Sequence, residues 1–319
     1  MALNQAADPK KVVIAALVAN GGIAIAKFVA AWLSGSATMV AEGVHSVADS
    51  ANQALLLLGM TLAARKAPAL YPLGRQRERY FWAFMVSLTL FFLGGVFAIY
   101  EGIGRIRGGH GDPVSPIAAV VVLVVSIALE SGSFIVAIRE FNRMRGKRPF
   151  AQALFSSKDP TIPVVLLEDA GAVAGLFVAL AAVLVAWATG SHVADGIGSI
   201  VIGVLLCAIG LLLAGDTKSL LIGESASPEQ EQAALEHAES TAGVEAVTQL
   251  LTMHLGPDSI LLALKIRFRD GMSLGEIEGA INAVEERIRS AVPAMTRIFV
   301  EPDGAYDRSK DPERATISR

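Results

Sequence analysis

The chain has 319 residues, of which 53 % are hydrophobic and only 18 % are charged. The mean hydropathy of +0.52 excludes an ordinary soluble protein and favours a membrane protein with several spans. The net charge of −3, without a basic tract, excludes a nucleic-acid-binding protein. The single cysteine, Cys207, cannot form an internal disulfide and is interpreted as a small core residue of an apolar helix.

Several apolar segments are long enough to cross a bilayer, which takes about 20 residues. The predicted spans are residues 11–33, 37–64, 80–104, 115–142, 161–188 and 194–222. The first is too long for the core of a signal peptide, so we expect it to be retained. The sequence thus predicts an all-α six-helix transmembrane domain over residues 11–222, preceded by a short segment, 1–10.

Lysine and arginine are concentrated in alternate connections between these spans. Lys10 and Lys11 precede the first span, and the second and fourth connections are rich in both residue types, whereas the first and fifth connections have neither. Cytoplasmic loops carry the excess of positive charge in membrane proteins. We therefore expect both termini to face the cytoplasm, or the matrix if the protein is organellar. The expected location of the chain is a bacterial inner membrane.

From residue 223 the composition becomes that of a soluble domain. Ser273 followed by Glu276 predicts a helix that begins with a capping box, and Gly256-Pro257-Asp258 predicts a turn between two strands. The predicted elements are helices at 228–242 and 273–292 and strands at 247–253, 260–268 and 297–300. This order indicates a cytoplasmic α+β domain of the ferredoxin-like αββαβ kind over 223–303, followed by a polar tail, 304–319, expected to be disordered.

A polar stripe runs along the second predicted span. His45 and Asp49 are four residues apart and lie one above the other on one helix face, with Glu42 one turn before them and Gln53 one turn after. Ionisable groups are costly within a membrane and mark ion pathways or pair with other groups. An imidazole beside a carboxylate suits a divalent transition metal. We interpret His45 and Asp49 as metal ligands, Glu42 as a gate, a vestibule charge or a partner for a polar group, and Gln53 as an amide that hydrogen-bonds a neighbouring helix.

The fifth predicted span contains two adjacent carboxylates, Glu168 and Asp169. Adjacent positions on a helix point about 100° apart, so at most one of the two can point straight at a given axis, and the other must face a neighbouring helix or reach around. We expect Asp169 to join His45 and Asp49 around one ion.

The first predicted span places Asn20 and Lys27 seven residues apart, on one face of the helix. Lys27 is deep enough in the membrane to need a partner, and Glu130 in the middle of the fourth span is the obvious one. We interpret Lys27 and Glu130 as a buried ion pair that fixes helix packing rather than as a direct transport element.

Two common mechanisms lack their sequence motifs. The sequence has no His-Glu-x-x-His pattern, which would indicate a zinc protease. It also has no glycine-rich phosphate loop, which would indicate transport driven directly by ATP. No nucleophile–base pair points to an enzyme.

The polar spans and the α+β domain together resemble the cation diffusion facilitator (zinc transporter) family over residues 11–303. The segment Tyr71–Trp82 resembles the entry to the third span in that family, especially in the branch of the animal mitochondrial zinc transporter, and Leu129-Glu130-Ser131 and Leu167-Glu168-Asp169 are similar to that branch. The resemblance implies a homodimer whose cytoplasmic domains pair.

The chain departs from the family pattern at Val165. Many zinc-selective members carry a histidine four residues before the aspartate of the fifth span, and Val165 occupies that place if Asp169 is this aspartate. Glu168 or water would then complete the site with His45 and Asp49. With one imidazole fewer, Mn²⁺, Co²⁺ and Fe²⁺ remain open as substrates beside Zn²⁺.

The expected function is a divalent cation/proton antiporter that exports Zn²⁺ from the cytoplasm. Metal binding needs a neutral imidazole and ionised carboxylates, so it displaces protons, and His45 is the best proton carrier because an ordinary histidine titrates near ~6.5. Two alternatives use the same ligands. A passive metal channel would lack proton coupling, and a metal-binding membrane sensor or scaffold would lack flux.

Overall fold

The computed structural model describes residues 9–34, 37–107, 116–190 and 192–304. The chain divides into two compact units, each described here by itself. The helical unit comprises Met1–Arg65 and Glu78–Lys218, and the α/β unit comprises Lys66–Arg77 and Ser219–Arg319. The short connection between the second and third helices therefore groups with the C-terminal part of the chain.

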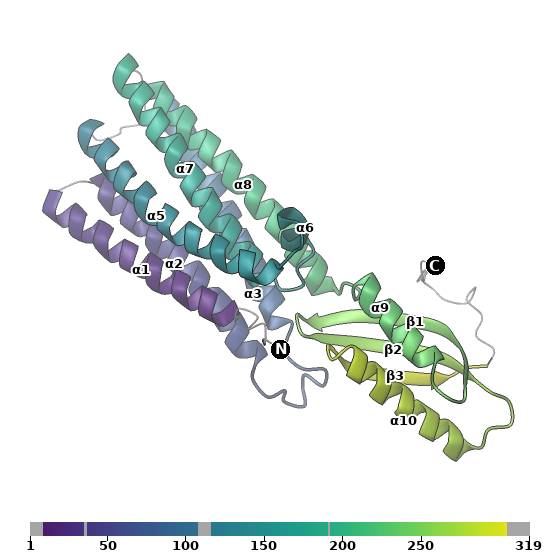
Figure 1. Ribbon diagram of the computed structural model, residues 1–319. Helices are drawn as coiled ribbons and strands as arrows, with labels where there is room; N and C mark the ends of the chain where they lie inside the picture. Colours follow the sequence, from purple (N-terminus) through teal and green to yellow (C-terminus); the bar gives the residue numbers. More distant parts are fainter. Residues whose placement is uncertain (1–8, 35–36, 108–115, 191, 305–319) are drawn as a thin grey trace. The chain divides into compact units, whose positions relative to one another are not determined.

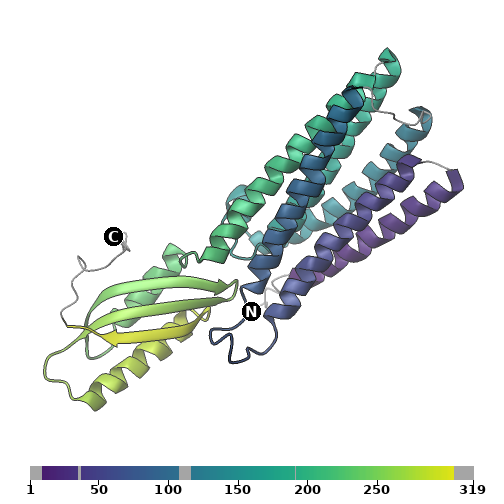
Figure 2. The ribbon, with the colours of Figure 1, turned by 180° about the vertical axis from the view of Figure 1, so that it is seen from behind.

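The helical unit is built from long helices that run up and down (Figures 1 and 2). Its elements are α1 (Pro9–Ser34), α2 (Ala37–Ala63), α3 (Glu78–Thr89), the π-helical segment η1 (Leu90–Val96), α4 (Phe97–Ile106), α5 (Pro116–Arg145), the short α6 (Phe150–Phe155), α7 (Thr161–Thr189) and α8 (His192–Ile222). Neither η1 nor α6 is predicted by the sequence pattern.

Five helical segments among the described residues are long and apolar enough to cross a membrane. They are Pro9–Val29, Glu78–Ile106, Pro116–Arg143, Thr161–Thr189 and Val193–Ile222. The remaining long helix, α2, has 27 residues and is long enough to span, but Asp49, Asn52 and Gln53 lower its hydropathy. The prediction of a helical membrane domain is confirmed, with five spans by composition and α2 as the sixth long helix.

The helices that carry the predicted site residues pack on one another. Helices α1 and α2 form an antiparallel hairpin, α5 and α7 form a second antiparallel pair, and α1 also contacts both α5 and α7. Figures 1 and 2 show these helices side by side. The polar faces of α1, α2, α5 and α7 are thereby turned toward a shared interior.

Helix α4 approaches α8 closely through glycines. A Cβ atom added at Gly102 would lie 2.6 Å from the carbonyl oxygen of Gly196, and one added at Gly203 would lie 2.7 Å from that of Gly95. Only a residue without a side chain permits this separation, as in other small-residue contacts between membrane helices. These contacts hold η1 and α4 close to α8, and an ion pair between Arg105 of α4 and Asp195 of α8 adds a polar contact.

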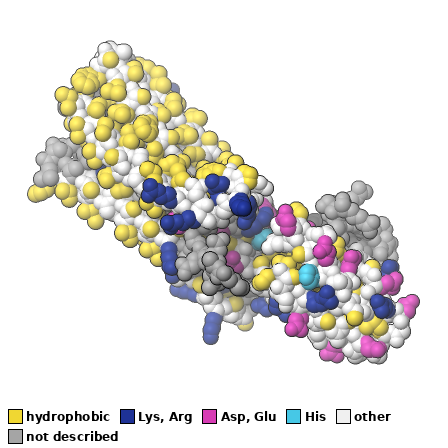
Figure 3. Space-filling view, viewed as in Figure 1, with side chains coloured by type: hydrophobic (Ala, Val, Ile, Leu, Met, Phe, Trp, Pro, Cys, Tyr) yellow, Lys and Arg dark blue, Asp and Glu magenta, His cyan; other side chains and the backbone are white. Residues whose placement is uncertain are grey.

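The surface of the helical unit matches its composition. Figure 3 shows hydrophobic side chains along its length and Lys and Arg side chains gathered at one end. The start of α1, with Lys10 and Lys11, and the end of α5, with Arg143 and Arg145, lie at this end because α1 and α5 run in opposite directions. An apolar wall with a basic rim is typical of an integral multi-pass membrane protein.

The α/β unit has the predicted order of elements, helix–strand–strand–helix–strand. They are α9 (Pro228–Glu239), β1 (Val244–Gly256), β2 (Ser259–Phe268), α10 (Leu274–Ala291) and β3 (Met295–Pro302). Helix α9 ends three residues before the predicted boundary, where the Thr241 hydroxyl donates to the His237 carbonyl at 2.8 Å. The strands extend beyond their predicted bounds at nearly every end.

The three strands form one mixed sheet with β2 in the centre. Strands β1 and β2 are antiparallel across the predicted turn, with His254 opposite Ile260, whereas β2 and β3 are parallel, with Leu264 opposite Val300. Helix α10 makes the crossover between the parallel strands. The inward residues of the central strand and of α10 form the core, namely Ile260, Leu262, Leu264, Ile266, Val284 and Ile288.

Both helices of this unit begin with a capping box. The Ser273 amide donates to the Glu276 carboxylate at 2.7 Å, and the Glu276 amide donates to the Ser273 hydroxyl at 3.4 Å, as predicted. Ser227 and Gln230 form the equivalent pair at α9. The hydrogen bonds from the backbone and side chain of Ser273 hold the pKa of Glu276 below its usual value.

The connection between α2 and α3 is built into the α/β unit. The Arg77 guanidinium donates to the Met253 sulfur at 3.1 Å, and the Gln76 side chain lies so close to Gly256 that an added Cβ atom there would be 2.5 Å from the Cβ of Gln76. Residues 66–77 therefore contact the end of strand β1 even though they lie between two helices of the helical unit in the sequence.

Replacing the N-cap of α10 should loosen its first turn. We expect Ser273→Ala to lower the free energy of local unfolding of α10 by about 1 kcal/mol, because an orphan backbone amide loses its acceptor. Hydrogen exchange of the full chain in detergent measures this directly. Helix α9 keeps its own box and is the internal control, and equal protection of α10 in both proteins would contradict the assignment.

The capping contact should also depend on pH. Because the pKa of Glu276 is lowered on folding, its stabilising effect is complete above the unfolded-state pKa of about 4.3 and is lost as pH falls through the lower folded-state pKa. We expect Glu276→Ala to reduce α10 protection at pH 7, with the difference from wild type vanishing at strongly acidic pH. Glu278 is an exposed glutamate further along α10, and Glu278→Ala should change the protection of α10 little at either pH.

Candidate functional site

The interior of the helical unit holds one ammonium group and several carboxylates. Among its described residues, the buried charged side chains are Lys27, Asp49, Glu130, Glu168 and Asp169. They come from α1, α2, α5 and α7, and the four carboxylates lie close enough for their charges to interact. When all five groups are ionised, three negative charges remain uncompensated in a setting where a buried charge is costly. Such an interior attracts cations.

Lys27 forms the buried ion pair that the sequence predicts. Its Nζ lies 3.1 Å from a carboxylate oxygen of Glu130 and donates to the Ser46 hydroxyl at 2.8 Å, and the Lys27 side chain is 1 % exposed. The three residues belong to α1, α5 and α2, so one ammonium group connects three helices. Ser46 also donates to Glu130 at 3.5 Å. This network fixes the part of α2 that carries His45 and Asp49.

The two adjacent carboxylates of α7 face different helices, as the 100° separation requires. The Asn52 amide of α2 donates to Oε1 of Glu168 at 2.6 Å, and the Ser133 hydroxyl of α5 donates to Oδ2 of Asp169 at 3.5 Å. Each acid is therefore oriented by a neutral donor on a separate neighbour. Helix α7 becomes the element that joins the α2 and α5 sides of the interior.

His45 and Asp49 form the predicted i, i+4 pair on α2. Nε2 of His45 lies 3.7 Å from Oδ2 of Asp49, and the side chains are 45 % and 9 % exposed. The imidazole thus lies at the border of the interior while the carboxylate lies inside it. Val165, one turn before Asp169, is buried in an apolar cluster with Leu56 and Leu213.

The remaining predicted residues divide into three cases. The side chain of Glu42 lies outside the described residues. Asn20 is buried, and Oδ1 has no hydrogen-bond partner among the described residues. Gln53 is also buried, and neither amide atom bonds a neighbouring helix within the described part of the chain, so its hydrogen bond to a neighbouring helix stays a prediction. Its neighbour Asn52 makes the interhelical bond instead, because Asn52 is the residue of this pair that reaches α7.

No three His, Cys, Asp or Glu side chains are grouped tightly enough to hold a metal ion in the part of the chain that the structure describes. His45 with Asp49, and Glu168 with Asp169, are brought into one interior without a closed ligand shell. Sequence reasoning missed Ser46, Asn52 and Ser133, which orient the charged groups. Their signal was their spacing, since each lies within three residues of a predicted site residue.

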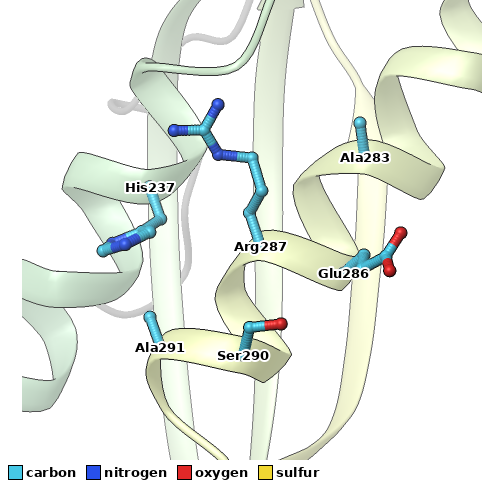
Figure 4. Close-up of a pocket in the computed structure, with 6 residues that line it drawn as sticks. All are labelled: His237, Ala283, Glu286, Arg287, Ser290 and Ala291. Atoms are coloured by element: carbon cyan, nitrogen blue, oxygen red, sulfur yellow. The ribbon is translucent and has the colours of Figure 1, made fainter.

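A pocket of about 400 Å³ lies between α9 and α10 of the α/β unit. It is lined by His237, Ala283, Glu286, Arg287, Ser290 and Ala291. Figure 4 shows the imidazole of His237 and the carboxylate of Glu286 pointing away from each other. The Arg287 guanidinium donates to the carbonyl and the hydroxyl of Ser240, and Nδ1 of His237 contacts the Ala233 carbonyl at 2.8 Å. The Arg287 bonds connect α10 to the end of α9, the His237 contact lies within α9, and the lining groups present no converging ligands.

A multi-span helical domain with carboxylates in its interior, joined to a small α/β unit, defines a membrane protein built to handle cations. A family model for the cation efflux transmembrane domain matches residues 13–222. The chain belongs to this family, the cation diffusion facilitators, whose members are transporters and not enzymes.

The chain is also similar to individual members of the family. It is 33 % identical over 263 residues to the mitochondrial proton-coupled zinc antiporter SLC30A9 of Xenopus laevis, covering 82 % of this chain and 47 % of that protein. It is 32 % identical to metal tolerance protein C4 of Arabidopsis thaliana, covering 82 % and 58 %, and 25 % identical to the magnetosome protein MamB of Paramagnetospirillum magneticum, covering 92 % and 94 %. The chain spans about half the length of the first two relatives.

Breaking the ion pair from one side should destabilise the helical unit strongly. Lys27→Met leaves the Glu130 carboxylate buried without its cation, and we expect a loss of about 3–5 kcal/mol in the free energy of unfolding in detergent. The double variant Lys27→Met with Glu130→Gln should recover most of this loss. As a control, Arg289→Met breaks an exposed pair with Glu285 and should cost less than about 1 kcal/mol. Equal losses in the single and double variants would contradict the buried pair.

Proposed function

We propose that the chain exchanges a divalent metal cation for protons across the membrane, with Zn²⁺ as its substrate and export from the cytoplasm as its direction. The observation that carries this proposal is the interior of four carboxylates and one ammonium group. A metal ion offsets two of the three uncompensated negative charges, and protons offset the same charges when the metal leaves. The printed names of the SLC30A9 relatives, as proton-coupled zinc antiporters, support zinc and proton coupling.

The proposed ligands are His45, Asp49 and Asp169, with Glu168 or water in the fourth place. Zinc takes imidazole nitrogen and carboxylate oxygen, and both carboxylates lie in the same interior. Closing this shell requires α2 and α7 to shift together, as alternating access by rocking helices would provide. Because metal binding requires ionised carboxylates and neutral imidazole, each binding event releases protons.

The topology proposed for this cycle has six spans, with α2 as the least apolar of them. Both termini face the cytoplasm, since the basic rim of the helical unit holds the start of α1 and the end of α5. The proposed location is a bacterial inner membrane. We further propose a homodimer, in line with the family resemblance.

The ligand assignment predicts loss of transport from one substitution. In proteoliposomes with a pH dye inside, Asp49→Ala should abolish Zn²⁺-driven proton movement, because the interior loses its ligand between His45 and the acids of α7. Asp270→Asn, which alters an exposed aspartate of the α/β unit, should transport normally. In the wild-type chain, metal flux without proton movement would establish the passive channel, and metal binding without flux would establish the sensor or scaffold. Normal exchange in Asp49→Ala would refute the ligand site.

The position of Val165 predicts a change of selectivity. Restoring an imidazole one turn before Asp169, with Val165→His, should raise the ratio of Zn²⁺ to Mn²⁺ transport, by roughly tenfold for one added soft ligand. Val164→His is the matched control, since Val164 and Val165 are buried in the same apolar cluster but point about 100° apart. An equal ratio in both variants would contradict Val165 as a ligand position.

A further inference from the structure

Three polar side chains, one each from α1, α2 and α7, bury polar atoms that have no hydrogen-bond partner among the described residues. Gln53 is 0 % exposed, and neither its Oε1 nor its Nε2 has a hydrogen-bond partner among the described residues. The same holds, within the described chain, for Oδ1 of Asn20 and Oε2 of Glu168. Native proteins satisfy nearly all such atoms by water, an ion or another side chain. These atoms therefore mark a place that accommodates a bound species.

The packing of α1 on α2 places two of these groups at the same level. Lys27 of α1 bonds Ser46 of α2, which fixes the antiparallel register of the hairpin. Seven residues back along α1 is Asn20, and seven residues forward along α2 is Gln53. Both steps equal about two helical turns, or about 10 Å, in the same direction along the bundle. Asn20 and Gln53 therefore face the same layer.

Glu168 brings the third group into this layer. Its Oε1 accepts the 2.6 Å hydrogen bond from Asn52, the residue next to Gln53, so the Glu168 carboxylate lies at this level of α2. Helix α1 contacts both α2 and α7, which closes the layer from the third side. Asn52 holds one carboxylate oxygen and leaves the other, Oε2, unused.

The ligand atoms that this layer offers are oxygens. Asn20 and Gln53 supply neutral carbonyl oxygens and Glu168 supplies one carboxylate oxygen, while imidazole and thiolate groups are missing from these three positions. Amide and carboxylate oxygens suit hard cations such as Mg²⁺ and Mn²⁺, which keep part of their water shell. His45, by contrast, supplies the nitrogen that zinc favours about two turns from Gln53, toward the start of α2.

We propose that Asn20, Gln53 and Glu168 form a second ion site, which binds a partly hydrated divalent cation through oxygen ligands alone. The site lies one helical turn from Asp49 along α2, on the side away from His45. Glu168 belongs to this site, which leaves water as the fourth ligand beside His45, Asp49 and Asp169. The role of this site in a transport cycle, where it would bind the ion before all of its water is lost, rests on the proposed function. Ion binding itself does not.

Binding of Mn²⁺ to the purified full chain in nanodiscs tests the site. Electron paramagnetic resonance counts free Mn²⁺ and so gives the number of ions bound per chain. We expect Asp49→Ala to retain one Mn²⁺ site, and the double variant Asp49→Ala with Gln53→Leu to weaken it at least tenfold. Ser87→Ala, which removes a buried hydroxyl bonded only within its own helix α3, should leave it unchanged when combined with Asp49→Ala.

A gain of affinity separates this site from a loss of folding. Gln53→Glu adds a second carboxylate to the layer, and in the Asp49→Ala background it should tighten Mn²⁺ binding at least tenfold. Absence of a Mn²⁺ site in Asp49→Ala, or unaltered affinity in both Gln53 variants, would overturn the second site. If the wild-type chain exchanged no metal for protons while Gln53 governed Mn²⁺ binding, the proposed function would fail and the second site would stand.

Discussion

The ammonium group of Lys27 is the buried positive charge on which the described part of the helical unit depends. It meets Glu130 of α5 and Ser46 of α2 from its own position on α1, so three helices share one charge. A lysine in a membrane interior is tolerated only with such partners. The pair neutralises one of four carboxylates, and Asp49, Glu168 and Asp169 add further negative charge to the same interior. Packing and cation attraction thus have a common origin in one ion pair.

The rest of the polar interior is graded along the helices rather than gathered at one point. His45 and Asp49 combine nitrogen and oxygen one turn apart, while Gln53 and Glu168 belong to the proposed second site. A cation that moves between them would exchange water for protein ligands in steps, which costs less than complete dehydration at once. Neutral donors, Asn52 and Ser133, hold the acids of α7 apart and direct them to different helices.

The outer helices and the α/β unit obey simpler rules. Helices α4 and α8 meet at glycines and through the Arg105–Asp195 ion pair, and the sheet of the α/β unit buries the apolar residues of β2 under α10. Residues 66–77 are the exception, since Arg77 and Gln76 contact β1. This connection follows directly from α2, the helix that carries His45 and Asp49, so the chain links a proposed ligand helix to the α/β unit covalently.

The sequence by itself determined the apolar spans, the αββαβ order, the capping box at Ser273 and the pairing of Lys27 with Glu130. Each follows from local rules: hydropathy over about 20 residues, periodicity and caps, and the need of a buried lysine for a carboxylate. Tertiary structure alone decided that Asn52 rather than Gln53 reaches α7, which helices Glu168 and Asp169 each face, and that residues 66–77 join the α/β unit. These outcomes depend on how far each helix is rotated about its own axis against its neighbours. That rotation is set by packing between segments far apart in the chain, which spacing within one segment does not encode.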